Sequence, residues 1–94
     1  MLLYICLFSK KDLKYYYGYT ENLKLRIEQH TNGRVESTKY RRPLELIYFE
    51  GCLNKDDALK REKYFKTYYG RMFLKNRLKN QMLLNSNSTG QVKK

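Results

Sequence analysis

Apolar and polar residues alternate in blocks along the chain, and the blocks predict its elements. Residues 2–8 (LLYICLF) and 15–20 (YYYGYT) are apolar, β-prone runs joined by the polar segment 9–14. Two such runs around a polar link predict a β-hairpin. The first run has no charged side chain, as expected for a strand that is buried on both faces. A third run, 44–52 (LELIYFEGC), begins after Pro43 and predicts a third strand.

The segment between the second and third runs predicts a helix and then a basic loop. Four side chains recur at the i, i+3, i+4 and i+7 spacing of one helical face: Leu23, Arg26, Ile27 and His30. Thr20 or Asn22 can cap this helix, with the acidic Glu21 near its positive end. Gly33 can end the helix, and residues 34–42 then form a loop that is rich in Lys and Arg.

Two more helices are predicted after the third strand, over residues 54–70 and 71–84. Asn54 can cap the first of them, acidic residues follow in its first turn, and Gly70 can end it. Three apolar residues mark its buried face: Ala58, Phe65 and Tyr69. Glu62 falls between them on the same face. The predicted order of elements is therefore β-β-α-β-α-α.

The chain has 94 residues, which is enough for one small domain. We predict a small α/β domain over residues 1–82, with a three-stranded sheet that starts with an antiparallel hairpin and is flanked by helices. Residues 83–94 are polar, and we expect them to form a flexible C-terminal tail. The apolar start is too short for a signal peptide or a membrane span. Cys6 and Cys52 lack metal-binding spacing, so we expect a cytoplasmic protein with reduced cysteines.

The net charge of +11, from 20 Lys and Arg against nine Asp and Glu, is large for this length. Because neutralising phosphates releases counterions, the charge indicates a polyanionic partner, and we rank nucleic acid ahead of a membrane surface. Lys39, Arg41 and Arg42, in the loop, are the candidates for phosphate contact. Three lysines of the second long helix are better explained as a solvated face: Lys60, Lys63 and Lys66.

Two charged residues lie on predicted apolar faces, Arg26 on the first helix and Glu62 on the second long helix. A half-buried carboxylate costs several kcal/mol unless it finds a cation, a metal or a proton. A direct pair between them would be purely structural. With a polynucleotide partner, however, the guanidinium of Arg26 suits a phosphate and the carboxylate of Glu62 suits Mg²⁺. With a tyrosine hydroxyl that orients water, they are the parts of one-metal phosphodiester hydrolysis.

The ordered set of motifs resembles the GIY-YIG nuclease domain in its compact single-domain bacterial form, which is related to the N-terminal domain of one component of the ABC excinuclease. LLY (2–4) and YYG (16–18) stand where the family has its two name-giving motifs. GYTENLKLRIEQH (18–30) is similar to the family's helix with an Arg and then a His four residues on. DALKREKYFK (57–66) is similar to the helix with the metal-binding glutamate. The resemblance covers roughly residues 2–80.

The resemblance implies roles for the clustered tyrosines. Tyr4 and Tyr16 match the two motif tyrosines, one of which would activate or orient water, and either could do so. Gly18 matches the glycine that lets the backbone come close to the site. Neighbours on a strand face opposite ways, so Tyr16 would face the site. Three other tyrosines are expected to pack in the core or to face DNA: Tyr15, Tyr17 and Tyr19.

The resemblance also implies roles for charged and polar residues. Arg26 matches the arginine that stabilises the phosphate in the transition state, and His30 a histidine near the scissile phosphate. Glu62 matches the single metal ligand, which would hold Mg²⁺ or Mn²⁺. The family's late asparagine matches either Asn76 or Asn80.

Three functions are weighed. The leading hypothesis is a metal-dependent endonuclease that hydrolyses DNA phosphodiester bonds, with a role in DNA repair or recombination. The alternative is a non-catalytic nucleic-acid-binding module with the same fold, which would bind strands by backbone contact and stacking. The third is a structural domain in which Arg26 and Glu62 merely pair. RNA is kept beside DNA as a partner. If the chain cuts alone, its sequence specificity should be poor, and a partner protein would supply the targeting.

Overall fold

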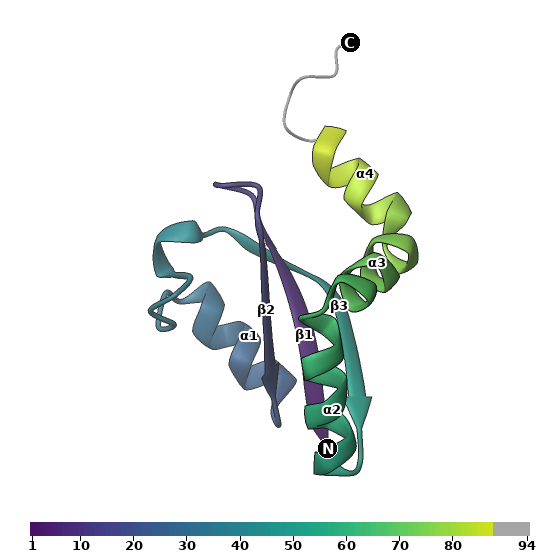
Figure 1. Ribbon diagram of the computed structural model, residues 1–94. Coiled ribbons are helices and arrows are strands. Elements are labelled where there is room, and N and C mark those ends of the chain that lie inside the picture. Colours follow the sequence, from purple (N-terminus) through teal and green to yellow (C-terminus); the bar gives the residue numbers. More distant parts are fainter. Residues whose placement is uncertain (88–94) are drawn as a thin grey trace.

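The computed structural model describes residues 1–87 and shows a three-stranded antiparallel sheet with helices on both faces (Figure 1). The strands are β1 (Leu2–Ser9), β2 (Tyr15–Thr20) and β3 (Leu44–Cys52), in the order β2-β1-β3. The predicted hairpin, third strand and α/β class are confirmed.

β1 is the central strand, and its composition explains why. It pairs with β2 on one side and with β3 on the other, so its residues from Leu3 to Phe8 have a neighbour on both strands. Residues 4–9 are all buried, and a charged side chain here would lack solvent and a partner. In this register Tyr4 lies opposite Tyr19 on β2 and opposite Glu50 on β3, which places the three on one face of the sheet.

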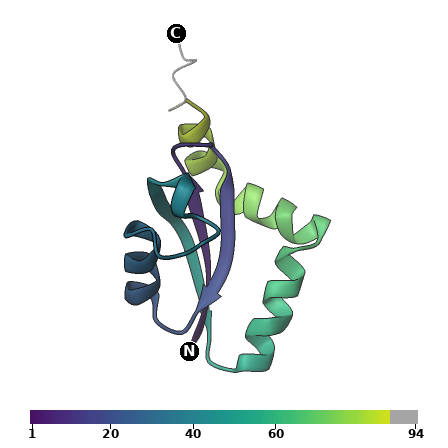
Figure 2. The same cartoon turned by 90° about the vertical axis from the view of Figure 1, so that its left-hand side faces the viewer.

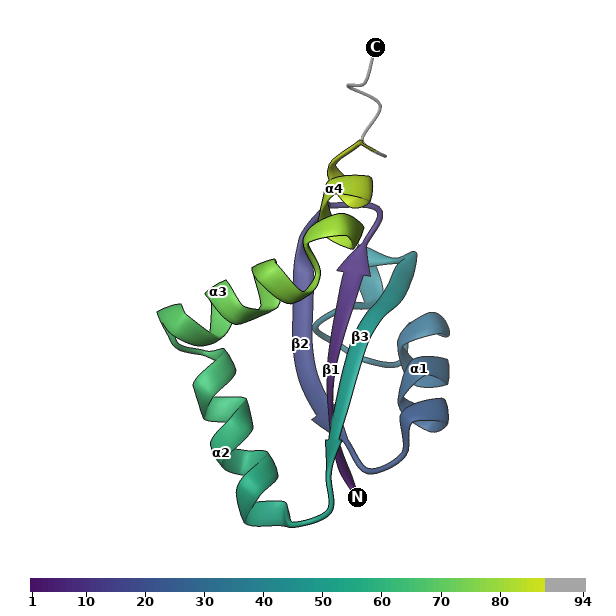
Figure 3. The same cartoon turned by 90° about the vertical axis from the view of Figure 1, so that its right-hand side faces the viewer.

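Helix α1 (Leu23–Thr31) covers one face of the sheet (Figures 2 and 3). The Asn22 side chain caps it by accepting a hydrogen bond from the Leu25 N–H at 3.0 Å. Gly33, at φ +75°, follows its end and donates to the His30 carbonyl at 3.2 Å, so the predicted stop at this glycine is confirmed. A short 3-10 helix, η1 (Lys39–Arg41), interrupts the basic loop that leads to β3.

Within the described residues, three helices follow β3: α2 (Lys55–Phe65), α3 (Tyr68–Arg77) and α4 (Lys79–Asn87). Helices α2 and α3 lie on the sheet face opposite α1 (Figure 3). Asn54 caps α2 by accepting hydrogen bonds from the Asp56 and Asp57 N–H groups at 2.9 and 3.2 Å, as predicted. The two helices predicted over 54–70 and 71–84 are thus three, with new boundaries.

Gly70 is the physical reason for this difference. It does not end a helix but lies in the first turn of α3, where it is buried against the end of α2. A Cβ at this position would collide with the backbone carbonyl of Tyr64, so only glycine lets the two helices meet at this corner. Tyr69 consequently leaves the buried face that the sequence assigned to it and is 74% exposed.

The main core lies between the sheet and the helices α2 to α4. It is built on four buried residues: Tyr4, Phe65, Leu74 and Leu78. The rings of Tyr4 and Phe65 stack with centroids 4.3 Å apart. Both cysteines are free, as expected; Cys6 is buried, whereas Cys52 is only half-buried.

The predicted division of the chain at residue 82 falls inside α4, which continues to Asn87. Most of the predicted tail, residues 88–94, lies outside the described residues, and the division stays a prediction. Among the helices within residues 1–87, none has the length and apolar character that a membrane span requires.

Candidate active site

The tyrosines of β2 face alternate sides of the sheet, as predicted. The ring of Tyr16 lies against His30 of α1, with centroids 5.0 Å apart. Tyr17 lies on the opposite face, 6.3 Å from the ring of Tyr4. Tyr15 packs against Phe8, with ring centroids 5.1 Å apart. The two motif tyrosines, Tyr4 and Tyr16, therefore lie on opposite faces of the sheet.

A cavity of about 200 Å³ opens between β2 and the corner of α2 and α3. Four of the residues that line it bear on chemistry or on access: Tyr4, Gly18, Glu62 and Arg71. Tyr17, Phe65 and Lys66 complete the lining. The cavity thus brings together Tyr4, Gly18 and Glu62, which the sequence nominated and which come from three different elements.

Gly18 lies between this cavity and the side chain of Tyr16 on the other face of the sheet. Its backbone lines the cavity beside Tyr4, while the ring of Tyr16 folds over its opposite side. A Cβ built on Gly18 would lie 3.0 Å from Cε2 and 3.2 Å from the hydroxyl of Tyr16, which is tighter than ordinary van der Waals contact. The glycine therefore allows the phenol of Tyr16 to reach the edge of β2.

Two carboxylates stand near Tyr4, but their surroundings differ. Glu50 is fully engaged: Arg61 donates to it from Nε at 2.7 Å and from Nη2 at 3.3 Å, and the Tyr48 hydroxyl donates at 2.8 Å. Burial by itself would raise the pKa of Glu50, but these hydrogen bonds hold that pKa below its ordinary value.

The side chain of Glu62 is 21% exposed, and its ion pair in the described chain is a long one, 3.8 Å to Nζ of the solvent-exposed Lys66. Glu62 is therefore the carboxylate that is free to bind a cation.

The residues present fit a metal ion that is shared with a substrate. Within residues 1–87 no three His, Cys, Asp or Glu side chains gather closely enough to hold an ion by themselves. Mg²⁺, however, is commonly held by one or two carboxylates, with water and substrate phosphates as the other ligands. The half-buried, weakly paired Glu62 satisfies that requirement as a single protein ligand.

Tyr4 reaches the cavity as a neutral phenol. It is 8% exposed, and burial raises its pKa well above the ordinary value of a phenol, with smaller contributions from Cys6 and Tyr17. At neutral pH its hydroxyl can therefore orient water or a phosphate oxygen by hydrogen bonding, but it is a poor base.

Arg26 and Glu62 do not pair. Within the described residues, the guanidinium of Arg26 donates to the Gln29 side chain at 3.3 Å on its own helix, and no ion pair joins it to Glu62. The sequence left open a purely structural explanation, in which Arg26 and Glu62 form an ion pair. That explanation is therefore wrong. Arg26 is half-buried on α1 and does not line the cavity of Glu62.

His30 is buried rather than poised beside a substrate, being only 1% exposed. Its Nδ1 lies 2.7 Å from the Thr38 hydroxyl, and its Nε2 has no hydrogen-bond partner within residues 1–87. Burial, and then the nearby charge of Arg26, lowers the pKa of His30 to about 4, so it is uncharged at neutral pH. The ring of His30 packs against Tyr16, and its predicted place near the scissile phosphate stays a prediction.

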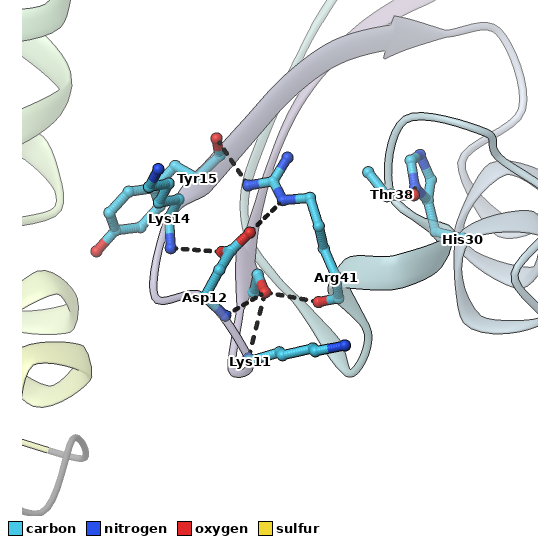
Figure 4. Close-up of polar contacts among 8 residues, drawn as sticks. Lys11, Asp12, Lys14, Tyr15, His30, Thr38 and Arg41 are labelled. Carbon is cyan, nitrogen blue, oxygen red and sulfur yellow. Dashed lines mark hydrogen bonds and ion pairs between the residues drawn. The ribbon is translucent and has the colours of Figure 1, made fainter.

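The three basic loop residues have different partners. Arg41 ties the loop to the hairpin: its guanidinium donates to the Asp12 carboxylate at 2.7 Å, and its carbonyl accepts from the Ser9 hydroxyl at 2.6 Å (Figure 4).

Lys39 and Arg42 instead line a hollow of about 530 Å³, together with Lys11 and Tyr40. All three basic loop residues stay predicted phosphate contacts, and Arg41 has a structural role as well.

Sequence reasoning missed Arg71. It stands just after Gly70, where the sequence predicted a break between helices, and no periodicity marked it as inward-facing. The two candidates for the late asparagine, Asn76 and Asn80, are exposed and do not line the cavity.

Comparison with known proteins gives a consistent family. Residues 1–80 match the family model described as the GIY-YIG catalytic domain. A UPF0213 protein of Staphylococcus epidermidis is 43% identical over 65 residues, which are 68% of this chain and 79% of that protein.

Two further relatives carry the same name. The UPF0213 protein of Staphylococcus haemolyticus is 38% identical over 73 residues, 77% of this chain and 89% of its own. The UPF0213 protein YazA of Bacillus subtilis is 44% identical over 57 residues, 60% of this chain and 58% of its own. No solved structure gives a significant match.

Proposed function

Because this chain belongs to the GIY-YIG catalytic domain family, we propose that it is an endonuclease that hydrolyses DNA phosphodiester bonds with the help of a divalent cation. The family implies a function of the nuclease type; the metal dependence and the DNA substrate are our proposals. The observation that carries them is one cavity that holds the weakly paired carboxylate of Glu62, the hydroxyl-bearing ring of Tyr4 and an uncovered stretch of backbone at Gly18.

Glu62 is the residue that would hold Mg²⁺ or Mn²⁺. When bound, such an ion supplies positive charge to the phosphate and to the leaving oxygen. Glu50 cannot share this task without giving up its hydrogen bonds to Arg61 and Tyr48. Residues 1–87 therefore offer one carboxylate at the cavity, and the remaining oxygen ligands would come from water and from the substrate.

The phenol of Tyr4 would orient the attacking water, and two observations support this role. It lines the same cavity as Glu62, and its raised pKa keeps the hydroxyl proton in place at neutral pH. Tyr16, across Gly18, would approach the same phosphate from the other side of β2. Of the two tyrosines, Tyr4 is the better supported because it shares the cavity with the carboxylate.

Arg26 would bind non-bridging phosphate oxygens, as the family resemblance implies. Its guanidinium makes a single hydrogen bond to Gln29 within the described residues, and most of its donors therefore remain for a ligand. The net charge of +11 and the hollow lined by Lys39 and Arg42 support a polyanion as the partner. A role in DNA repair or recombination, a targeting partner protein and a cytoplasmic location stay predictions.

The test is nicking of supercoiled plasmid and of branched DNA in Mg²⁺, Mn²⁺ or EDTA. We expect metal-dependent cutting that Glu62→Gln lowers by at least about 100-fold, because the ion loses its only protein carboxylate. Glu28→Gln is the matched control, since Glu28 lies on α1, away from the cavity. Circular dichroism and the melting temperature of each variant check that the fold is kept.

Two results would contradict the proposal. Wild-type cleavage by Glu62→Gln would remove the metal role of this carboxylate. DNA that is bound but never cut, on every substrate and with every metal, would instead favour a non-catalytic nucleic-acid-binding module.

A further inference from the structure

The cavity of Glu62 contains more positive than negative charge. Lys66 and Arg71 both line it, and Glu62 is the one carboxylate among its lining residues. Lys66 lies 3.8 Å from Glu62, whereas Arg71 makes no ion pair with any residue of the described chain. An arginine without a carboxylate, at the edge of a cavity, has its donors available for an anionic ligand.

Arg71 is nevertheless held in place by two features. Its guanidinium lies 5.1 Å over the ring of Tyr17, a cation–π contact that leaves the N–H groups at its edge free. The corner between α2 and α3 fixes its backbone, because Gly70 packs against the Tyr64 carbonyl and its N–H donates to the Thr67 hydroxyl at 3.1 Å. The cation is thus oriented before any ligand arrives.

The charged groups around a phosphate in this cavity would come from different helices. Arg71 approaches the cavity from α3 and Glu62 from α2, while Arg26 belongs to α1 on the other face of the sheet. A phosphodiester in the cavity would therefore meet a cation that neither the family motifs nor the sequence periodicity identified. A bidentate guanidinium matches two phosphate oxygens, and Lys66 can act as a point charge beside it.

We propose that Arg71, assisted by Lys66, forms a phosphate-binding subsite that holds a phosphodiester group of the substrate beside the carboxylate of Glu62. This inference rests on the proposed nuclease function and deepens it, because it names the group that positions the substrate in the cavity. The charge of Arg71 also lowers the pKa of Tyr17 and Tyr4 against the larger effect of burial, so it acts on the phenols of the same cavity.

The test measures binding of a fluorescently labelled DNA duplex as a function of salt, without relying on cleavage. All proteins carry Glu62→Gln, so that no substrate is cut during the titration. Arg71→Gln removes the charge but keeps a planar group that can lie on Tyr17. Lys75→Ala is the matched control, because it removes one positive charge from an exposed position of α3 that does not line the cavity.

We expect Arg71→Gln to weaken binding roughly tenfold or more and to reduce the slope of log K against log salt by about 0.9, the value for one phosphate contact. Lys75→Ala should leave the slope nearly unchanged. Equal effects of the two variants would overturn the subsite, since Arg71 would then contribute only general charge.

Folding and catalysis are separated from this result. If Arg71→Gln lowers the melting temperature, Arg71→Lys, which keeps the positive charge, is measured instead. We expect Arg71→Lys to keep the slope of log K against log salt. A lowered slope in this variant as well would contradict a phosphate contact. If the wild-type protein binds DNA but never cuts it, the nuclease proposal fails, while a slope that depends on Arg71 would still establish the subsite.

Discussion

Tyr4 serves both the core and the candidate site. Its ring stacks on Phe65 at 4.3 Å and is almost fully buried, while the same side chain lines the cavity beside Glu62. The ring therefore contributes to stability, whereas the hydroxyl is the group that we propose for catalysis. His30, another predicted site residue, is also buried, by its contacts with Thr38 and Tyr16.

This separation of ring and hydroxyl can be tested with Tyr4→Phe. The variant keeps the stacking on Phe65, so the free energy of unfolding should change by less than about 1 kcal/mol. DNA cleavage should fall by about 100-fold, because the variant lacks the hydroxyl that we propose orients water. Denaturant titration and nicking assays measure the two effects. Tyr17→Phe, which removes a hydroxyl from the same cavity, should retain most of the activity; equal losses in both variants would argue against a particular role for Tyr4.

The corner of α2 and α3 is the element-scale feature on which the site depends. It places Glu62 and Arg71, which come from different helices, in the lining of one cavity. Thr67 caps α3 by accepting from the Gly70 N–H, and Gly70 allows the backbone of the two helices to touch. A helix that continued to Gly70, as the sequence suggested, would carry Arg71 away from this position.

Gly70→Ala should therefore be severely destabilising for a single methyl group. The new Cβ would collide with the Tyr64 carbonyl, which as backbone cannot move aside, and we expect a loss of about 2 kcal/mol or more in the free energy of unfolding. Urea denaturation measures this loss. Gly51→Ala is the control, because its Cβ would meet only the flexible side chains of Met1 and Leu3, and it should cost less than about 1 kcal/mol. Equal stability of the two variants would mean that the corner is not tightly closed.

At the scale of the whole molecule, the positive charge is spread over separate regions of the surface. Lys66 and Arg71 lie at the cavity on the side of α2, and Lys39 and Arg42 line the hollow beside the hairpin turn. A long polyanion could contact both regions, whereas a small phosphate ester would meet only one. The distribution therefore favours a polynucleotide over a small anionic substrate.

The salt dependence of DNA binding tests this distribution. If Lys39 and Arg42 each contact a phosphate, the double variant Lys39→Ala/Arg42→Ala should reduce the slope of log K against log salt by about 1.8. The control is Lys60→Ala/Lys63→Ala, which removes the same charge from α2 at positions that do not line the hollow. Fluorescence anisotropy between low and moderate salt gives the slopes. An equal reduction in both double variants would show that DNA binding depends only on the net charge of the protein.

The sequence by itself determined the elements whose causes are local. Strand bounds followed from apolar runs, the caps at Asn22 and Asn54 from side chains that reach their own helix, and the stop at Gly33 from the ease with which glycine adopts a positive φ. The inward position of Glu62 followed from helical periodicity, and the family resemblance rested on the same ordered motifs.

Only the tertiary structure decided which of these residues meet. It separated Tyr4 from Tyr16, bound Arg41 to Asp12, buried His30 and brought Arg71 to Glu62. Each outcome depends on contacts between segments that are distant in the chain or on the close approach at Gly70. Periodicity reports which face of an element is buried, but the partner across that face is set by the packing of the whole domain.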